Sequence, residues 1–152
     1  MWYSTYMEVR LHPLFRRWLD QLVDHEAGDV DWFEVYVEVM ALIAALGEFG
    51  RGLGDPESHP VVSAGYDLHA LRRTPPTVTT PYADGPPVLR ILYGFVTNDD
   101  GDELAVVAIA GDKAALGNAW YQANLNRAQD RIDQWCQHNP GYKPIIKRGG
   151  RR

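Results

Sequence analysis

The stretch VLRILYGFVTNDDGDELAVVAIA, residues 88–110, decides the fold of this chain. Its two ends, residues 88–96 and 103–110, are rich in the apolar and aromatic residue types that favour β-strands. Between them stands Asn98-Asp99-Asp100-Gly101, a strong signal for a tight turn. The sequence therefore predicts a β-hairpin that belongs to an antiparallel sheet.

A further strand is expected upstream of this hairpin, over residues 66–72. The segment between them, RTPPTVTTPYADGPP at residues 73–87, is rich in proline, which cannot donate a backbone hydrogen bond to a sheet. We expect this segment to be an exposed loop.

Helical periodicity marks the two ends of the chain. After a short first strand at residues 6–11, His12-Pro13 begins a helix, and Asp29 or Asp31 caps a second one. The second helix ends in the glycine-rich loop of residues 47–60, which lacks the strand, helix and lysine of a phosphate-binding loop. The apolar positions of the two helices are Leu14, Phe15, Trp18, Leu19, Leu22, Trp32, Val35, Tyr36, Val39, Leu42, Ile43, Leu46 and Phe49.

A final helix begins near Ala114, and its apolar face is Leu125, Ala128, Ile132 and Trp135. The order β-α-α-β-β-β-α predicts an α+β fold with an antiparallel sheet of three to four strands. We expect two N-terminal helices and the C-terminal helix to pack on one face of this sheet and to leave the other open. Residues 1–140 form a single domain, and residues 141–152 form a basic tail.

Composition narrows the class of protein. Cys136 is the one cysteine, so no internal disulfide forms, and no Cys/His spacing fits a zinc site. No apolar run approaches the roughly 20 residues that span a bilayer, and the N-terminus lacks the pattern of a secretion signal. A cytoplasmic protein without membrane contact or cofactor is expected.

The net charge of −5 argues against a nucleic-acid binder, because phosphate contacts need a basic surface. The distribution of charge weakens this objection. Residues 1–60 hold 4 basic and 11 acidic side chains, whereas residues 61–152 hold 11 basic and 9 acidic ones, including every lysine. Positive charge is therefore concentrated in the second half of the chain.

Several motifs occur in one order along the chain: EVRLHPLFRRWLDQL (residues 8–22), LHALR (68–72), LRILYGF (89–95), Gly111-Asp112-Lys113, Trp120-Tyr121 and Ala128-x-Asp130. Together they resemble the HigB-like branch of the RelE/ParE toxin superfamily, whose members belong to type II toxin-antitoxin systems. The resemblance covers most of residues 6–135. It departs from the family pattern in the long proline-rich loop and in the acidic net charge.

The resemblance implies a RelE-like fold and a ribosome-dependent messenger RNA endonuclease that needs no metal. Its implied partners are a helix-turn-helix antitoxin and messenger RNA on the ribosome. Two other functions remain open: a ParE-like toxin that binds DNA gyrase, and a non-catalytic binding module with the same fold. Fold alone does not separate these functions.

Alternation along the strands provides independent candidates for the site. Leu89 and Ile91 point to one face of the sheet and Arg90 to the other, so Arg90 leaves the core on the opposite face. If Leu71 is buried, Arg72 faces outward as well, and the two arginines meet on neighbouring strands. They would then bind an anion such as phosphate, or pair with nearby acids such as Asp67 and Asp112.

The resemblance makes Lys113 the third catalytic candidate beside Arg90 and Arg72, as a base with a neutral amine. Tyr121 is placed as a residue that stacks on a base or donates a proton. Arg73 and His69 complete the expected substrate-binding set, although alternation puts His69 on the face of Leu71. The remaining histidines have no catalytic context in the sequence: His12, His25, His59 and His138.

Overall fold

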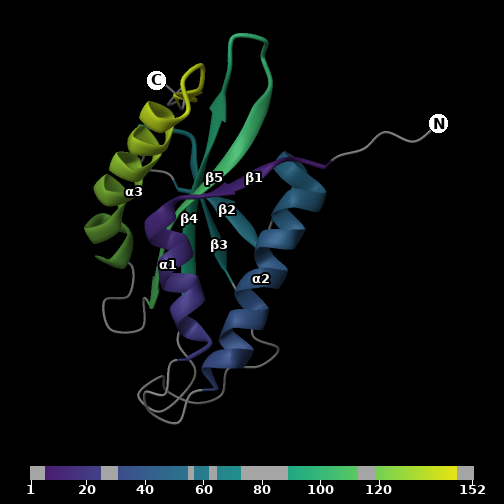
Figure 1. Cartoon of the computed structure of the whole chain (residues 1–152), viewed down its shortest axis with the longest axis vertical. Helices are drawn as coiled ribbons and strands as arrows, with labels where there is room; N and C mark the ends of the chain where they lie inside the picture. Colours follow the sequence, from purple (N-terminus) through teal and green to yellow (C-terminus); the bar gives the residue numbers. More distant parts are fainter. Residues whose placement is uncertain are drawn as a thin grey trace, which may run out of the picture.

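The computed structural model of the chain describes residues 6–24, 31–54, 57–61, 65–72, 89–112 and 119–146, with the Asp112 side chain excepted. Its helices and strands follow one another in the order shown in Figure 1. They are β1 (Val9–Leu11), α1 (Pro13–Leu22), α2 (Trp32–Phe49), the short 3-10 helix η1 (Gly50–Gly52), β2 (Ser58–Pro60), β3 (Leu68–Arg72), β4 (Leu89–Thr97), β5 (Glu103–Asp112), α3 (Ala119–His138) and β6 (Lys143–Pro144).

The described strands form one mixed sheet in the order β1-β5-β4-β3-β2, with β6 paired to β4. Strands β3, β4 and β5 pair in antiparallel fashion, as predicted, and the unpredicted β2 and β6 do so too, but β1 runs parallel to β5. The α+β class is confirmed. The prediction of three to four antiparallel strands is wrong, because the described sheet has six strands and is mixed. The sequence did not reveal β2 and β6 because they are too short to show a period of two. The parallel pairing of β1 is long-range and leaves no local pattern.

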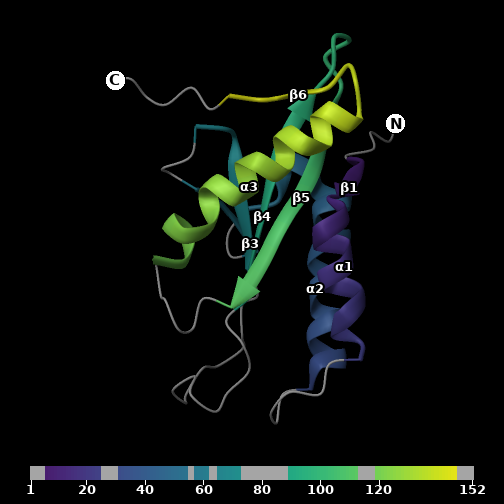
Figure 2. The same cartoon turned by 60° about the vertical axis from the view of Figure 1, so that its left-hand side comes forward.

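Helices cover both faces of the sheet, and this corrects the expectation of one open face. Figures 1 and 2 show α1 and α2 side by side on one face and α3 crossing β3, β4 and β5 on the other. Consecutive residues of β4 are buried on alternate faces: Ile91, Tyr93 and Phe95 lie in the core under α1 and α2, while Leu92 and Val96 lie in the core under α3. The uninterrupted apolar run of β4 is typical of a strand covered twice.

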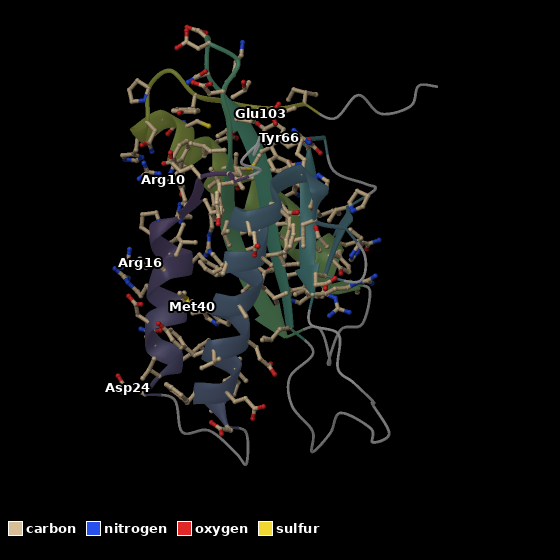
Figure 3. All side chains as sticks on the ribbon, turned by 90° about the vertical axis from the view of Figure 1, so that its right-hand side faces the viewer. Arg10, Arg16, Asp24, Met40, Tyr66 and Glu103 are labelled. Atoms are coloured by element: carbon tan, nitrogen blue, oxygen red, sulfur yellow. The ribbon has the colours of Figure 1, made fainter. Side chains whose placement is uncertain are left out.

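Local capping follows the sequence. The His12 Nδ1 accepts a hydrogen bond of 3.0 Å from the backbone N–H of Leu14, with Pro13 in the first turn of α1. Asp31 caps α2 by accepting from the N–H of Glu34 at 3.1 Å, so this aspartate is the cap of the two considered. Figure 3 shows the two helices side by side, with Asp24 at the opposite end of the molecule from Glu103.

The predicted hairpin between β4 and β5 is confirmed. The Asn98 Oδ1 accepts from the backbone N–H groups of Asp100 and Asp102, and Gly101 has a φ of 83°, which favours glycine. Further along, Leu92 pairs with Ile109 and Tyr93 with Val107, so Ala108 is the extra residue of a β-bulge. Both Ala108 and Ile109 therefore face α3.

Residues 143–146 belong to the sheet, in contrast to the separate tail expected from residue 141. Lys143 and Pro144 form β6 against the end of β4, and Ile146 bridges to Tyr66. The backbone N–H of Ile145 donates to the carbonyl of Phe95 at 3.0 Å. These backbone contacts carry no sequence periodicity, because the segment is only a few residues long. Within the described part of the chain, none of the helices combines the length and apolar character needed to cross a bilayer.

Candidate functional site

The two arginines singled out from the sequence face each other across the sheet. Arg72 ends β3 and Arg90 lies near the start of β4, and the two residues are direct partners in the antiparallel register. Both side chains are half-buried. Because directly opposed residues share one face, both point to the α3 side, as Leu92 does two residues after Arg90. The structure thus confirms that the two arginines are neighbours on one face.

The guanidinium of Arg90 binds neutral oxygens. Its Nε donates to the Tyr121 Oη at 3.1 Å, and its Nη1 donates to the Leu89 carbonyl at 2.8 Å. Among the residues that the structure describes, Arg90 forms no ion pair with a carboxylate. Asp67, one of the two acids considered as its partner, is engaged elsewhere, and the Asp112 side chain lies outside the described part. The charge of Arg90 is therefore positioned but not neutralised by these residues.

The first turn of α3 brings Tyr121 to the arginines. Trp120, buried beneath this turn, packs on Gly111 of β5, where a Cβ atom would come within 2.7 Å of the Trp120 Nε1. Gly111 is also the β5 partner of Arg90, so the absence of a side chain there lets α3 approach the sheet beside Arg90. The Asn124 side chain donates to the Trp120 carbonyl at 2.8 Å within the same turn.

A histidine that the sequence left without a role joins this group. His59 lies on β2 opposite Ala70 of β3, and its ring meets the Tyr121 ring edge-on, with a centroid distance of 6.2 Å and an interplanar angle of 79°. Tyr121 thus contacts strands on both sides of β3. Sequence reasoning missed His59 because the segment SHP stands among Gly, Pro and acidic residues and gives no strand signal.

His69 lies on the opposite face, half-buried against Tyr93 and Phe95, and does not reach Arg72 or Arg90. Its ring stacks on Tyr93 at 5.4 Å, and its Nε2 donates to the Asp67 Oδ1 at 2.9 Å. Alternation along β3 had placed it on this face. Of the other sequence-predicted site residues, Arg73 and Lys113 lie outside the described residues.

Asp67 connects His69 to an ion-pair network at the hairpin end of the sheet. The Arg51 Nη1 donates to the Asp67 Oδ2 at 3.0 Å, and its Nε donates to the Glu103 Oε1 at 2.6 Å. The Arg51 guanidinium also lies 4.0 Å from the centroid of the Phe95 ring. Burial lowers the pKa of Arg51, but the bonds to Glu103 and Asp67 outweigh it and raise this pKa. Its charge is balanced within the fold.

On the same face, the Ser58 Oγ and the Tyr93 Oη share a buried hydrogen bond of 2.7 Å. Burial raises the pKa of Tyr93, and the bond to Ser58 partly opposes this shift. The bond links β2 to β4 across β3. It therefore fixes which residues of β2 face α2 and which face α3.

A separate cavity of about 360 Å³ lies between the start of α1 and the end of α3. Its lining residues are Leu11, His12, Pro13, Leu14, Gln134, Trp135, His138 and Asn139. The polar groups of His12 already serve the fold, because its Nδ1 caps α1 and its Nε2 donates to the Gln134 Oε1 at 3.0 Å. Within the described ranges, His, Cys, Asp and Glu side chains form no group that would hold a metal ion.

Comparison with family models, with curated proteins and with solved structures finds no significant match to this chain.

Proposed function

We propose that this chain is the toxin of a type II toxin-antitoxin pair with a RelE-like fold, and that it cuts messenger RNA on the ribosome without a metal. The observation that carries the proposal is Arg90, held by Tyr121 opposite Arg72, with no described carboxylate to balance its charge. Two guanidinium groups on neighbouring strands can hold one phosphate, because their N–H groups fit phosphate geometry.

The chemistry is an attack of the ribose 2′-oxygen on the adjacent phosphorus, with departure of the 5′-oxygen. Positive charge on the phosphate oxygens stabilises the transition state, and this is the role of Arg72 and Arg90. Tyr121 holds the Arg90 guanidinium and offers a ring on which a nucleobase stacks. Lys113 stands next to the site in sequence, two residues after the β5 partner of Arg90, and is the third catalytic candidate through the resemblance.

The test is induced expression in a bacterial host, with growth followed and translated messages mapped by primer extension. Wild type should arrest growth and cut messages, whereas Arg90→Ala and Lys113→Ala should do neither. Arg16→Ala is the matched control, because it removes an exposed arginine on α1 and should stay toxic. Toxicity retained in both site variants would overturn the assigned site.

The same experiment separates the other two functions. Growth arrest without message cleavage, with DNA gyrase inhibited, indicates a ParE-like toxin. Absence of any arrest by a folded wild-type protein indicates a binding module. Either outcome overturns the ribonuclease proposal.

A further inference from the structure

The proposed cleavage needs a group that accepts the proton of the 2′-hydroxyl. Arginine does not exchange protons near neutral pH, because its guanidinium stays charged. An imidazole is the common side chain that accepts a proton in this range. The sequence candidate for this base, Lys113, lies outside the described residues, and His69 lies across the sheet from the arginines, stacked on Tyr93.

His59 lies on the side of the sheet where the arginines are. The register of β2 pairs Ser58 with Leu71 and His59 with Ala70. Ser58 is buried and bonded to Tyr93 on the α2 face, so alternation directs His59 to the α3 face. There it lies diagonal to Arg72, which follows Ala70 by two residues on the same face. This diagonal spacing is about 7–8 Å between Cα atoms, which long and aromatic side chains can bridge.

Tyr121 connects His59 to Arg90. It meets the His59 ring edge-on and accepts a hydrogen bond from Arg90, so one side chain touches both β2 and β4. His59 is half-buried, which leaves part of its ring accessible to a bound molecule. The histidine, the two arginines and the tyrosine therefore form one cluster on three strands and one helix.

We propose that His59 is the general base of the RNA cleavage proposed above, and the inference rests on that function. The neutral imidazole takes the proton of the 2′-hydroxyl while the bond between the 2′-oxygen and phosphorus forms. The bond between phosphorus and the 5′-oxygen breaks, and a water molecule gives its proton to the departing oxygen. The products are a 2′,3′-cyclic phosphate and a 5′-hydroxyl, and the hydroxide left from that water takes up the proton from His59.

Charged and titratable groups lie around His59. Arg72 is diagonal to it on β3, Tyr121 meets its ring from α3, and Glu57 stands two residues before it, with its carbonyl bonded to the Arg72 N–H. The neutral form of an imidazole is the one that accepts a proton. The acidic limb of the pH-rate profile should therefore report His59.

The test measures single-turnover cleavage of a message on purified ribosomes from pH 5 to 9. His59→Gln should lower the rate constant about 100-fold or more, leave half-saturation unchanged, and abolish the acidic limb. His138→Gln, which alters an exposed histidine at the end of α3, should match wild type. Imidazole in solution should restore part of the activity of His59→Ala, a result that a structural role does not produce.

The outcomes separate the inference from the function on which it rests. A wild type that cleaves beside a His59→Gln variant with the same rate and pH profile overturns the role of His59 alone. A slow His59→Gln variant that keeps the acidic limb, with no rescue of His59→Ala by imidazole, also overturns it. A folded wild type that leaves translated messages intact overturns both proposals.

Discussion

Arg51 on the α2 face and Arg90 on the α3 face differ in the groups that bind their guanidinium. Arg51 is bound by Asp67 and Glu103 and lies on the Phe95 ring, so its charge is used within the fold. Arg90 is bound by a hydroxyl and a carbonyl, with no carboxylate partner among the described residues. A cation held by neutral groups is positioned for an external anion, whereas a cation held by carboxylates is structural.

Replacing each of the two arginines by alanine should give the largest difference in cleavage rate. Arg90→Ala should lower RNA cleavage about 100-fold or more, because a transition-state contact is lost, and should cost about 1–2 kcal/mol of stability, because two hydrogen bonds are lost. Arg51→Ala should leave cleavage intact and cost about 1–2 kcal/mol of stability, from two partly exposed ion pairs and one cation–π contact. Cleavage rates and urea unfolding measure both. Equal effects of the two variants on cleavage would break the comparison.

Gly111→Ala should show how far the α3 face depends on close packing. The new Cβ would come within 2.7 Å of the Trp120 indole, so α3 must shift, at a cost of about 1–3 kcal/mol. Cleavage should fall as well, because Tyr121 moves with Trp120. Gly54→Ala is the control, since its Cβ would meet nothing within 4 Å. Equal urea midpoints for the two variants would contradict this prediction.

Tyr121→Phe tests whether cleavage depends on the hydroxyl that accepts the hydrogen bond of Arg90. It removes the oxygen that receives the Arg90 Nε and keeps the ring that meets His59. Loss of one such bond costs about 1 kcal/mol, or roughly fivefold in rate, with stability changed by less. Tyr142→Phe, at the far end of α3 against Trp135, should leave the rate unchanged. A Tyr121→Phe rate equal to wild type would remove this hydroxyl from the mechanism.

His12 should give the smallest effect, on the contact between the two helical layers. Burial lowers the pKa of His12 from its usual 6.5. The bond to Gln134 raises this pKa in part, and the charges of Arg131 and His138 lower it further. The unfolded chain therefore takes up the proton first. The contribution of His12 to the free energy of unfolding is fully present above pH 6.5. It is lost as the pH drops below that value, because a proton on Nδ1 removes the cap of α1.

The measurement is the urea midpoint of wild type and His12→Asn between pH 7.5 and 5. Asparagine also caps helices but does not titrate in this range, so the variant should lose about 0.5–1 kcal/mol less than wild type. Parallel pH curves for the two proteins would show that His12 is not the titrating group.

Local signals were sufficient for much of this fold. The His12-Pro13 helix start, the Asp31 cap and the Asn98 turn were predicted because each is made by residues a few positions apart. The pairing of Arg72 with Arg90 also followed from strand alternation. By contrast, β2 and β6 are stabilised by backbone pairing to distant strands, and two or three residues carry no readable period.

The periodicities, the caps, the hairpin and the α+β class follow from the sequence, since these depend on neighbours along the chain. Three features depend on tertiary packing instead: α3 covers the face opposite α1 and α2, Asp67 bonds Arg51 and His69 rather than Arg90, and His59 contacts Tyr121. Successive side chains of a strand point to opposite faces of the sheet. Which helix covers each face, and which charge finds a partner there, depends on long-range packing that no local pattern contains.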